Sequence, residues 1–436
     1  MNNMIQERNK RTEWFLRDRF GMFIHWGLYA IPARGEWFRQ VEKISNEAYQ
    51  QYFDEFDSVS YDPSKWAKAA KEAGMKYAVM TAKHHDGFCL FDSKLTQYKS
   101  TNTKAKRDLT REYLEAFRAE GLYVGLYYSL LDWHHDHYPA FDDENHPMNG
   151  SLTYKDKPVD FSKYLDYMHG QVRELLTSYE KIDIIWFDFS YSNMTAETWK
   201  ATELVKMTRE LQPGIIIDDR LEANSEWGGE IVKSIKSNNP SIYSGDFVSP
   251  EQIIPPVKIV DENGSNLPWE ACVTMNSNWG YNNFDMDYKS SKDIIRVLVE
   301  CVSKGGNLLL NVGPTAKGEI PKEQLNILND IGNWMKPNGQ SIYGCKSADL
   351  KKPEWGRYTQ KGNTLYAHIY DRGIGPIRLE GLEGKIKKGR MLADCSEVEI
   401  GRPWYISDTP NDTFIILKSQ RLPDDIDTVV ALTLNG

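Results

Sequence analysis

The sequence lacks the motifs that mark several common classes of enzyme. Among its 436 residues, no G-x-G-x-x-G or P-loop pattern follows an expected strand, and no H-E-x-x-H pattern occurs. These absences argue against the usual dinucleotide, nucleotide and zinc-protease sites. No apolar run is long enough to cross a bilayer. The five cysteines are scattered without a C-x-x-C pair, so we expect free thiols rather than a disulfide framework or a zinc site.

Basic charge is also scarce, because the net charge is -9. Nothing in the sequence would neutralise a stripe of phosphates, so nucleic acid is not expected as a partner. The N-terminal M-N-N-M-I-Q-E-R-N-K-R has no apolar signal core. We therefore expect either a cytoplasmic protein or one whose signal peptide was removed ahead of this numbering. The sequence leaves the compartment and the oligomeric state open.

The stretch I-D-I-I-W-F-D-F-S, residues 182–190, anchors the expected fold. Its apolar run has the length of a strand buried on both faces, as in parallel sheets covered by helices. The run ends in Asp188, and the carboxyl ends of such strands carry the functional residues of barrel enzymes. Taken alone, an acid in this position is more often the N-cap of the next helix.

Strands and helices alternate along the first three quarters of the chain. This pattern predicts an α/β fold, a (β/α)8-like TIM barrel over residues 1–340, with an open doubly wound sheet as the alternative. The expected strands lie near residues 22–24, 77–81, 123–129, 184–188, 215–217 and 308–312. The expected helices lie at 9–19, 63–73, 107–120, 161–179, 195–212, 291–304 and 324–335. Residues 221–268 read as a long irregular region.

The pattern changes beyond Cys345. Short β-rich runs such as T-L-Y-A-H-I-Y and T-V-V-A-L-T-L are separated by turn residues, and no helical spacing intervenes. We expect a C-terminal antiparallel β-sandwich over residues 341–436, packed against the barrel. His368 is expected to be structural.

Polar and aromatic residues follow several of the expected strands. His25 ends the first, Glu36 and Trp37 lie in the loop after it, and His84 and His85 follow the second. Neutral imidazoles, a carboxylate and an indole suit a ligand rich in hydroxyl groups. Adjacent histidines could instead bind a metal ion, and so could the later cluster of Asp132, His134, His135, Asp136 and His137. Because metal sites need further spaced ligands, we expect no metal and no cofactor.

Barrel strand ends that gather carboxylates, histidines and indoles indicate hydrolysis of a glycosidic bond. That reaction needs one carboxylate as a nucleophile or base and a second carboxyl group to protonate the leaving oxygen. Asp188 is the expected nucleophile because a strand end holds it rigidly. The expected acid/base is Glu251, in G-D-F-V-S-P-E-Q, and Glu270, after Trp269, is its rival.

Six blocks of the sequence resemble one enzyme family. F-G-M-F-I-H-W-G, T-A-K-H-H-D-G-F, I-I-W-F-D, S-P-E-Q, W-E-A-C with N-W-G-Y, and G-G-N-L-L-L-N-V-G-P are similar to the signature blocks of the α-L-fucosidases of glycoside hydrolase family 29. They stand in the family's order over roughly residues 10 to 320. The family also carries a C-terminal β-sandwich.

The resemblance implies a retaining exo-hydrolase that removes terminal α-L-fucose from fucosylated oligosaccharides or glycoconjugates. It implies that Asp188 is the nucleophile and that Glu251, in a block similar to the family's T-P-E, is the acid/base. The remaining matching positions are expected to bind the sugar: His25, Glu36, Trp37, His84, His85, Tyr128, Trp186, Arg220 and Glu270.

The sequence departs from the family after the nucleophile, where D-F-S stands in place of the glycine of many members. This departure bears on the leaving-group side of the site. Linkage preference among α-1,2, α-1,3/4 and α-1,6 bonds and the natural glycan stay open. The alternatives to an active fucosidase are a metal-dependent hydrolase, a catalytically weak or inactive fucose-binding protein, and a retaining hydrolase for a related sugar.

Overall fold

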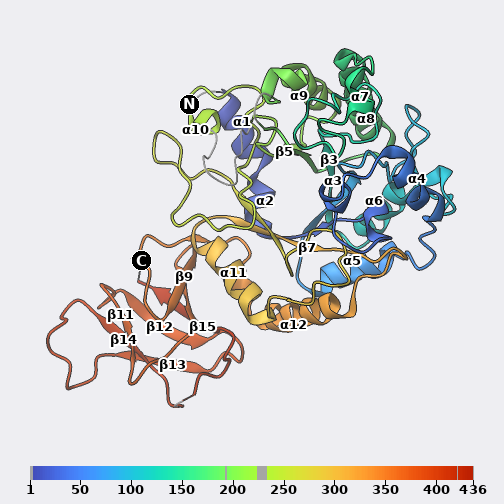
Figure 1. The fold of residues 1–436 in the computed structure, drawn as a ribbon. Coiled ribbons are helices and arrows are strands. Elements are labelled where there is room, and N and C mark those ends of the chain that lie inside the picture. Colours follow the sequence, from blue (N-terminus) through green and yellow to red (C-terminus); the bar gives the residue numbers. More distant parts are fainter. Residues whose placement is uncertain (1–2, 192–193, 223–232, 420, 436) are drawn as a thin grey trace.

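The first part of the chain forms a curled sheet of seven parallel strands (Figure 1). The computed structural model describes residues 3–191, 194–222, 233–419 and 421–435. The strand order is β5-β4-β3-β2-β1-β7-β6, so the first strand pairs with both the second and the seventh. The strands are β1 (Phe20–Ile24), β2 (Tyr77–Lys83), β3 (Tyr123–Ser129), β4 (Ile184–Asp188), β5 (Ile216–Ile217), β6 (Glu270–Thr274) and β7 (Asn307–Val312).

An irregular segment joins the two edges of this sheet and closes the barrel. The amide of Asp246 donates to the carbonyl of Ile217 in β5, and the amide of Glu270 in β6 donates to the carbonyl of Val248. Further along, the Gln252 amide donates to the carbonyl of Cys272. Pro250 lies within the segment and has no N–H to donate, which explains why the pairing stays irregular. The barrel prediction is confirmed, and this closing segment carries Glu251.

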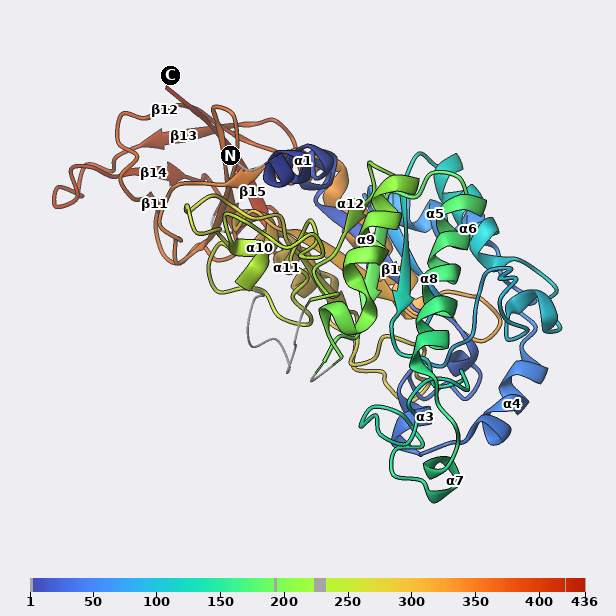
Figure 2. The same cartoon turned by 90° about the horizontal axis from the view of Figure 1, so that it is seen from above.

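Helices cover the outside of the barrel (Figures 1 and 2). Each buries one apolar stripe, as α5 does with Trp66 and Ala70, and α5 starts at Pro63 after the N-cap Asp62. Seven of the helices are α2 (Glu13–Asp18), α5 (Pro63–Glu72), α6 (Leu109–Ala119), α8 (Phe161–Ser178), α9 (Ala201–Leu211), α11 (Ser291–Ser303) and α12 (Lys322–Asn338). The others are α1 (Asn3–Arg11), α3 (Phe38–Val41), α4 (Asn46–Glu55), α7 (Leu152–Lys155) and α10 (Lys233–Lys236). Among the described residues, none of the helices is long and apolar enough to span a membrane.

The last quarter of the chain is an eight-stranded antiparallel sheet that curls around its own apolar core. It lies beside α11, away from α7 and α8 (Figures 1 and 2). His368 is fully buried and contacts Asp427 at 2.7 Å, while Trp334 of α12 donates to the Asp427 carbonyl. The strands are β8 (Lys346–Ser347), β9 (Gly356–Lys361), β10 (Thr364–Ile369), β11 (Ile377–Leu379), β12 (Ile386–Met391), β13 (Glu397–Gly401), β14 (Thr413–Ile416) and β15 (Thr428–Leu434).

Glu270 lies on the floor of the barrel rather than at its mouth. It is the first residue of β6, paired with Asn307 at the start of β7, whereas Asp188 is the last residue of β4. The carboxyl group is fully buried and accepts a hydrogen bond from the Tyr77 hydroxyl. The sequence predicts Glu270 as a sugar contact, whereas the structure places it at the opposite end of the barrel from Asp188. Burial raises the pKa of its carboxyl group to about 8.

Replacement of Glu270 by glutamine should change how stability depends on pH. In the unfolded chain the Glu270 carboxyl group has a pKa near 4.5, whereas in the folded protein its pKa is about 8. The stability that the protonated carboxyl group contributes is therefore full below pH 4.5 and is lost as the pH rises to 8. The free energy of unfolding of the wild type, relative to Glu270→Gln, should therefore fall by up to about 1.4 kcal/mol per pH unit in this window.

Urea unfolding at several pH values between 5 and 9 measures this difference. Glu115→Gln, at an exposed position on α6, is the matched control and should follow the wild type. Parallel curves for Glu270→Gln and the wild type would contradict the placement of a buried, protonated carboxyl group at this position.

Candidate active site

Asp188 stands at the carboxyl end of β4, in the mouth of the barrel. Its side chain is nearly buried, with the residue 8% exposed. The Tyr127 hydroxyl donates to Oδ2 at 2.6 Å, and Arg220 Nη1 donates to Oδ1 at 2.9 Å. Each oxygen therefore accepts one hydrogen bond, and neither contact blocks the whole carboxylate. The arrangement fixes the carboxylate group in one orientation.

Glu251 reaches the same point from the segment that closes the barrel. The nitrogen of Arg220 that contacts Asp188 also donates to Glu251 Oε2 at 2.8 Å. Because one atom contacts both, the two carboxylate oxygens lie within about 6 Å of each other. Trp279 Nε1 donates to the second oxygen of Glu251 at 3.2 Å. The Glu251 side chain is 41% exposed, so solvent reaches this carboxylate more readily than Asp188.

His25 presents a neutral imidazole whose tautomer is set by its neighbours. The amide nitrogen of Asn311 donates to the carbonyl of Trp279, so the Asn311 oxygen faces His25 Nδ1, at 2.7 Å. Nδ1 must therefore carry the proton. Burial lowers the pKa of His25 to about 3, so the ring is neutral at ordinary pH. Its Nε2 is left as a hydrogen-bond acceptor.

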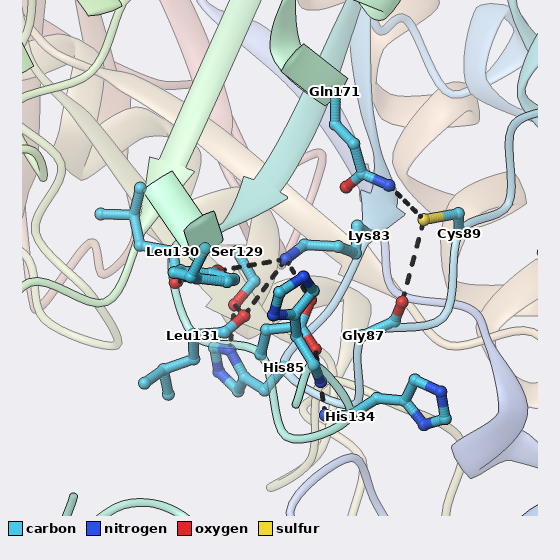
Figure 3. Close-up of polar contacts among 12 residues, drawn as sticks. Lys83, His85, Gly87, Cys89, Ser129, Leu130, Leu131, His134 and Gln171 are labelled. Atoms are coloured by element: carbon cyan, nitrogen blue, oxygen red, sulfur yellow. Dashed lines mark hydrogen bonds and ion pairs between the residues drawn. The ribbon is translucent and has the colours of Figure 1, made fainter. Parts of the chain in front are cut away.

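His85 is arranged in the same way on the next strand. Its Nδ1 lies 2.7 Å from Ser129 Oγ, and that hydroxyl donates to the Leu131 carbonyl at 2.9 Å (Figure 3). Because the serine proton points to the Leu131 carbonyl, His85 Nδ1 donates the hydrogen bond to Ser129 Oγ. Burial, with a smaller effect of the nearby Lys83 charge, lowers the pKa of His85 to about 3. A second neutral imidazole therefore offers Nε2 as an acceptor.

His84 and Glu36 complete the polar lining. The ring of His84 stacks on Tyr127 with centroids 5.5 Å apart, and burial lowers its pKa well below the usual value. In the described part of the chain, no group pairs with His84 Nδ1. Glu36 accepts a hydrogen bond from the Gly280 amide at 2.7 Å. Burial, with a smaller effect of the Glu251 charge, raises the pKa of Glu36 to about 7.

Two indoles flank these groups. Trp186, two residues before Asp188, lies under the Arg220 guanidinium, whose carbon is 4.4 Å from the ring centroid. Trp37 contacts the His85 ring at 5.0 Å between centroids and is only partly buried. The predicted residues that the structure brings together are His25, Glu36, Trp37, His84, His85, Trp186, Asp188, Arg220 and Glu251.

Tyr128 does not join this group. Successive side chains of a strand point to opposite faces, and Tyr128 points outward, where its hydroxyl donates to Gln171 at 2.8 Å. Tyr127 points into the barrel and contacts Asp188 instead. The sequence prediction named Tyr128 because a strand buried on both faces does not distinguish its two adjacent tyrosines. The register with β4, which pairs Tyr127 with Trp186, is the signal that separates them.

The aspartates and histidines of the loop after β3 form ion pairs and ring contacts with neighbouring residues. Asp132 forms a buried ion pair with Lys83 at 2.9 Å, and His134 stacks on Tyr98 with centroids 3.7 Å apart. Over residues 3–191, 194–222, 233–419 and 421–435, no three His, Cys, Asp or Glu side chains are grouped so that they could hold a metal ion. The geometry therefore suits two carboxylates and several neutral hydrogen-bond acceptors around a polyhydroxylated ligand.

Comparison with known proteins agrees with this chemistry. The family model described as Alpha-L-fucosidase matches residues 2–340. The chain belongs to the α-L-fucosidase family. An α-L-fucosidase of Dictyostelium discoideum is 30% identical over 388 residues, covering 82% of this chain and 77% of that protein. Human tissue α-L-fucosidase is 30% identical over 391 residues, covering 83% and 76%.

Solved structures of α-L-fucosidases share the whole fold. Isoenzyme 1 of Paenibacillus thiaminolyticus is 62% identical with a TM-score of 0.95, covering 99% of this chain and all of that one. An α-L-fucosidase of glycoside hydrolase family 29 from Bacteroides thetaiotaomicron, solved as a trapped covalent intermediate, is 29% identical with a TM-score of 0.82. That match covers all of this chain and 97% of the other.

The two adjacent tyrosines of β3 allow a matched test in this α-L-fucosidase. Tyr127→Phe removes a hydrogen bond to a charged carboxylate, so kcat on an aryl α-L-fucoside should fall about ten- to a hundredfold. Tyr128→Phe removes the bond to Gln171 and should lower the free energy of unfolding by about 1 kcal/mol while kcat stays near the wild-type value. Steady-state kinetics of both variants measure the change in kcat, and urea unfolding measures the change in stability. Similar losses of kcat in the two would contradict the placement.

Proposed function

We propose that the protein is a retaining α-L-fucosidase in which Asp188 is the nucleophile and Glu251 is the acid/base. The observation that carries this proposal is the shared contact of Arg220, which holds the two carboxylates within about 6 Å. Retaining glycosidases place their two carboxyl groups about 5 to 5.5 Å apart, whereas inverting enzymes leave about 6.5 to 9.5 Å for a water molecule.

In the first step, Asp188 attacks the anomeric carbon of the fucosyl residue. The bond between that carbon and the leaving oxygen breaks, and Glu251 supplies a proton to the oxygen. The product is a fucosyl ester on Asp188. The Tyr127 and Arg220 donors orient the carboxylate for this attack.

In the second step, water attacks the anomeric carbon and releases Asp188. Glu251 now acts as the base that takes the proton of the attacking water. Its partial exposure supports this role, because the leaving group must depart past it and water must then reach it. Two inversions at one carbon give fucose with the configuration of the substrate.

Hydroxyl groups of the fucose are held by the neutral lining of the pocket. The free Nε2 atoms of His25 and His85 accept hydrogen bonds from two hydroxyls, and the carboxyl group of Glu36 binds a further one. Trp37 supplies an apolar surface for the C–H face of the ring. Because neither imidazole is charged at neutral pH, these two rings add no positive charge that would oppose an oxocarbenium-like transition state. The substrates are fucosylated glycans.

The acid/base assignment predicts a specific chemical rescue. Glu251→Ala should lower kcat/KM for a fucosylated disaccharide by about 10²- to 10⁴-fold, because its leaving oxygen needs a proton. An aryl fucoside with a good leaving group should lose much less. Added azide should accelerate turnover of that aryl substrate and give α-L-fucosyl azide, since the anion attacks the ester on Asp188 without a general base.

Glu270→Gln is the control for this experiment. It should show no azide product, because Glu270 lies on the barrel floor. Azide rescue of Glu270→Gln, or its absence in Glu251→Ala, would transfer the acid/base role away from Glu251.

A further inference from the structure

Phe189, directly after the nucleophile, has an unusual backbone conformation. Its φ is 80°, in the region that side chains other than glycine rarely adopt. A bulky aromatic residue in this region is strained unless its surroundings hold it there, and such outliers gather at functional sites. The turn at Phe189 brings its ring back toward the barrel mouth, beside the residues that line the fucose pocket.

Three rings meet at this place. Phe189 lies 5.3 Å from Trp37 and 5.0 Å from His85, centroid to centroid, and Trp37 and His85 are themselves 5.0 Å apart. Phe189 and Trp37 are partly exposed, whereas His85 is 2% exposed. The two larger rings therefore stand at the rim of the pocket and the imidazole stands deeper.

Neighbouring residues hold the Phe189 ring in place. Tyr191 contacts the Phe189 ring with centroids 5.1 Å apart. The Tyr191 hydroxyl donates to Asp143, and Tyr138 lies within hydrogen-bond distance of the same hydroxyl, at 3.4 Å. Both partners belong to the long loop after β3. The Phe189 ring is thus held by packing and by an anchored neighbour, which explains how the unfavourable φ persists.

We infer that Phe189, beside the fucose-contacting Trp37, forms the wall of the subsite that holds the sugar from which fucose is released. This inference rests on the proposed function, in which the fucose hydroxyls meet the polar groups in the depth of the pocket. A residue at the rim then faces whatever is attached to the anomeric oxygen. Pyranose rings present an apolar C–H face, and partly exposed aromatic rings are the surfaces that such faces cover.

The test compares two substrates in a matched pair of variants. α-L-Fucosyl fluoride has no leaving-group sugar, whereas a fucosylated disaccharide has one. In Phe189→Leu, which is apolar but has no ring, the ratio of kcat/KM for the disaccharide to that for the fluoride should fall at least about tenfold, which corresponds to about 1.4 kcal/mol of lost transition-state binding. Phe189→Tyr, which keeps the ring, should stay within about twofold of the wild-type ratio.

Phe189→Gly and Phe189→Ala separate this role from backbone strain. Both lack the ring and should lose the disaccharide preference equally, but Gly accepts the positive φ and should have the higher midpoint of thermal unfolding. An unchanged ratio in Phe189→Leu, or a ratio in Phe189→Tyr as low as that of Phe189→Leu, would overturn the inference. If the wild type hydrolysed neither substrate, the proposed function itself would fail.

Discussion

A single guanidinium group holds together the two carboxylates proposed to react. Arg220 contacts Asp188 on β4 and Glu251 on the closing segment through one nitrogen, so the distance between the two carboxylates depends on where this side chain lies. Trp186 supports it from below, and Ser249 accepts from two of its other nitrogens. A buried cation with two anionic partners avoids the large penalty of an unpaired buried charge.

The position of Glu251 depends in turn on how the barrel is closed. Segment 246–252 has no regular strand hydrogen bonding of its own, and Asp246 at its start is anchored instead. The Asp246 carboxylate accepts from Arg11 of α1 at 2.8 Å, from Arg209 of α9, and from the amide of Ile217 at 2.9 Å. Two helices far apart in the sequence thus fix the strand-like segment that places Glu251, the proposed acid/base.

Much of the fold and of the site could be predicted from the sequence because both follow local patterns. Apolar runs ending in polar residues identified six of the seven barrel strands, all but β6, and their carboxyl ends placed His25, His84, His85 and Asp188 at one mouth. Glu270 and Tyr128 could not be placed in this way. Glu270 begins its strand rather than ending it, and Tyr128 lies on a strand whose two faces are equally buried. Both positions depend on the direction of the strand and on its register with neighbouring strands, which only the folded sheet provides.

The central claim is that Asp188 forms the covalent bond to fucose. 2-Fluoro-fucosyl fluoride tests it most directly. The fluorine at C2 slows both formation and hydrolysis of the ester, but the reactive fluoride leaving group at C1 lets formation outpace hydrolysis, so the sugar stays attached. After protease digestion, mass spectrometry should find one 2-fluoro-fucosyl group, on Asp188 in the peptide that contains β4. Labelling of Glu36 or Glu251 with Asp188 unmodified would contradict the account.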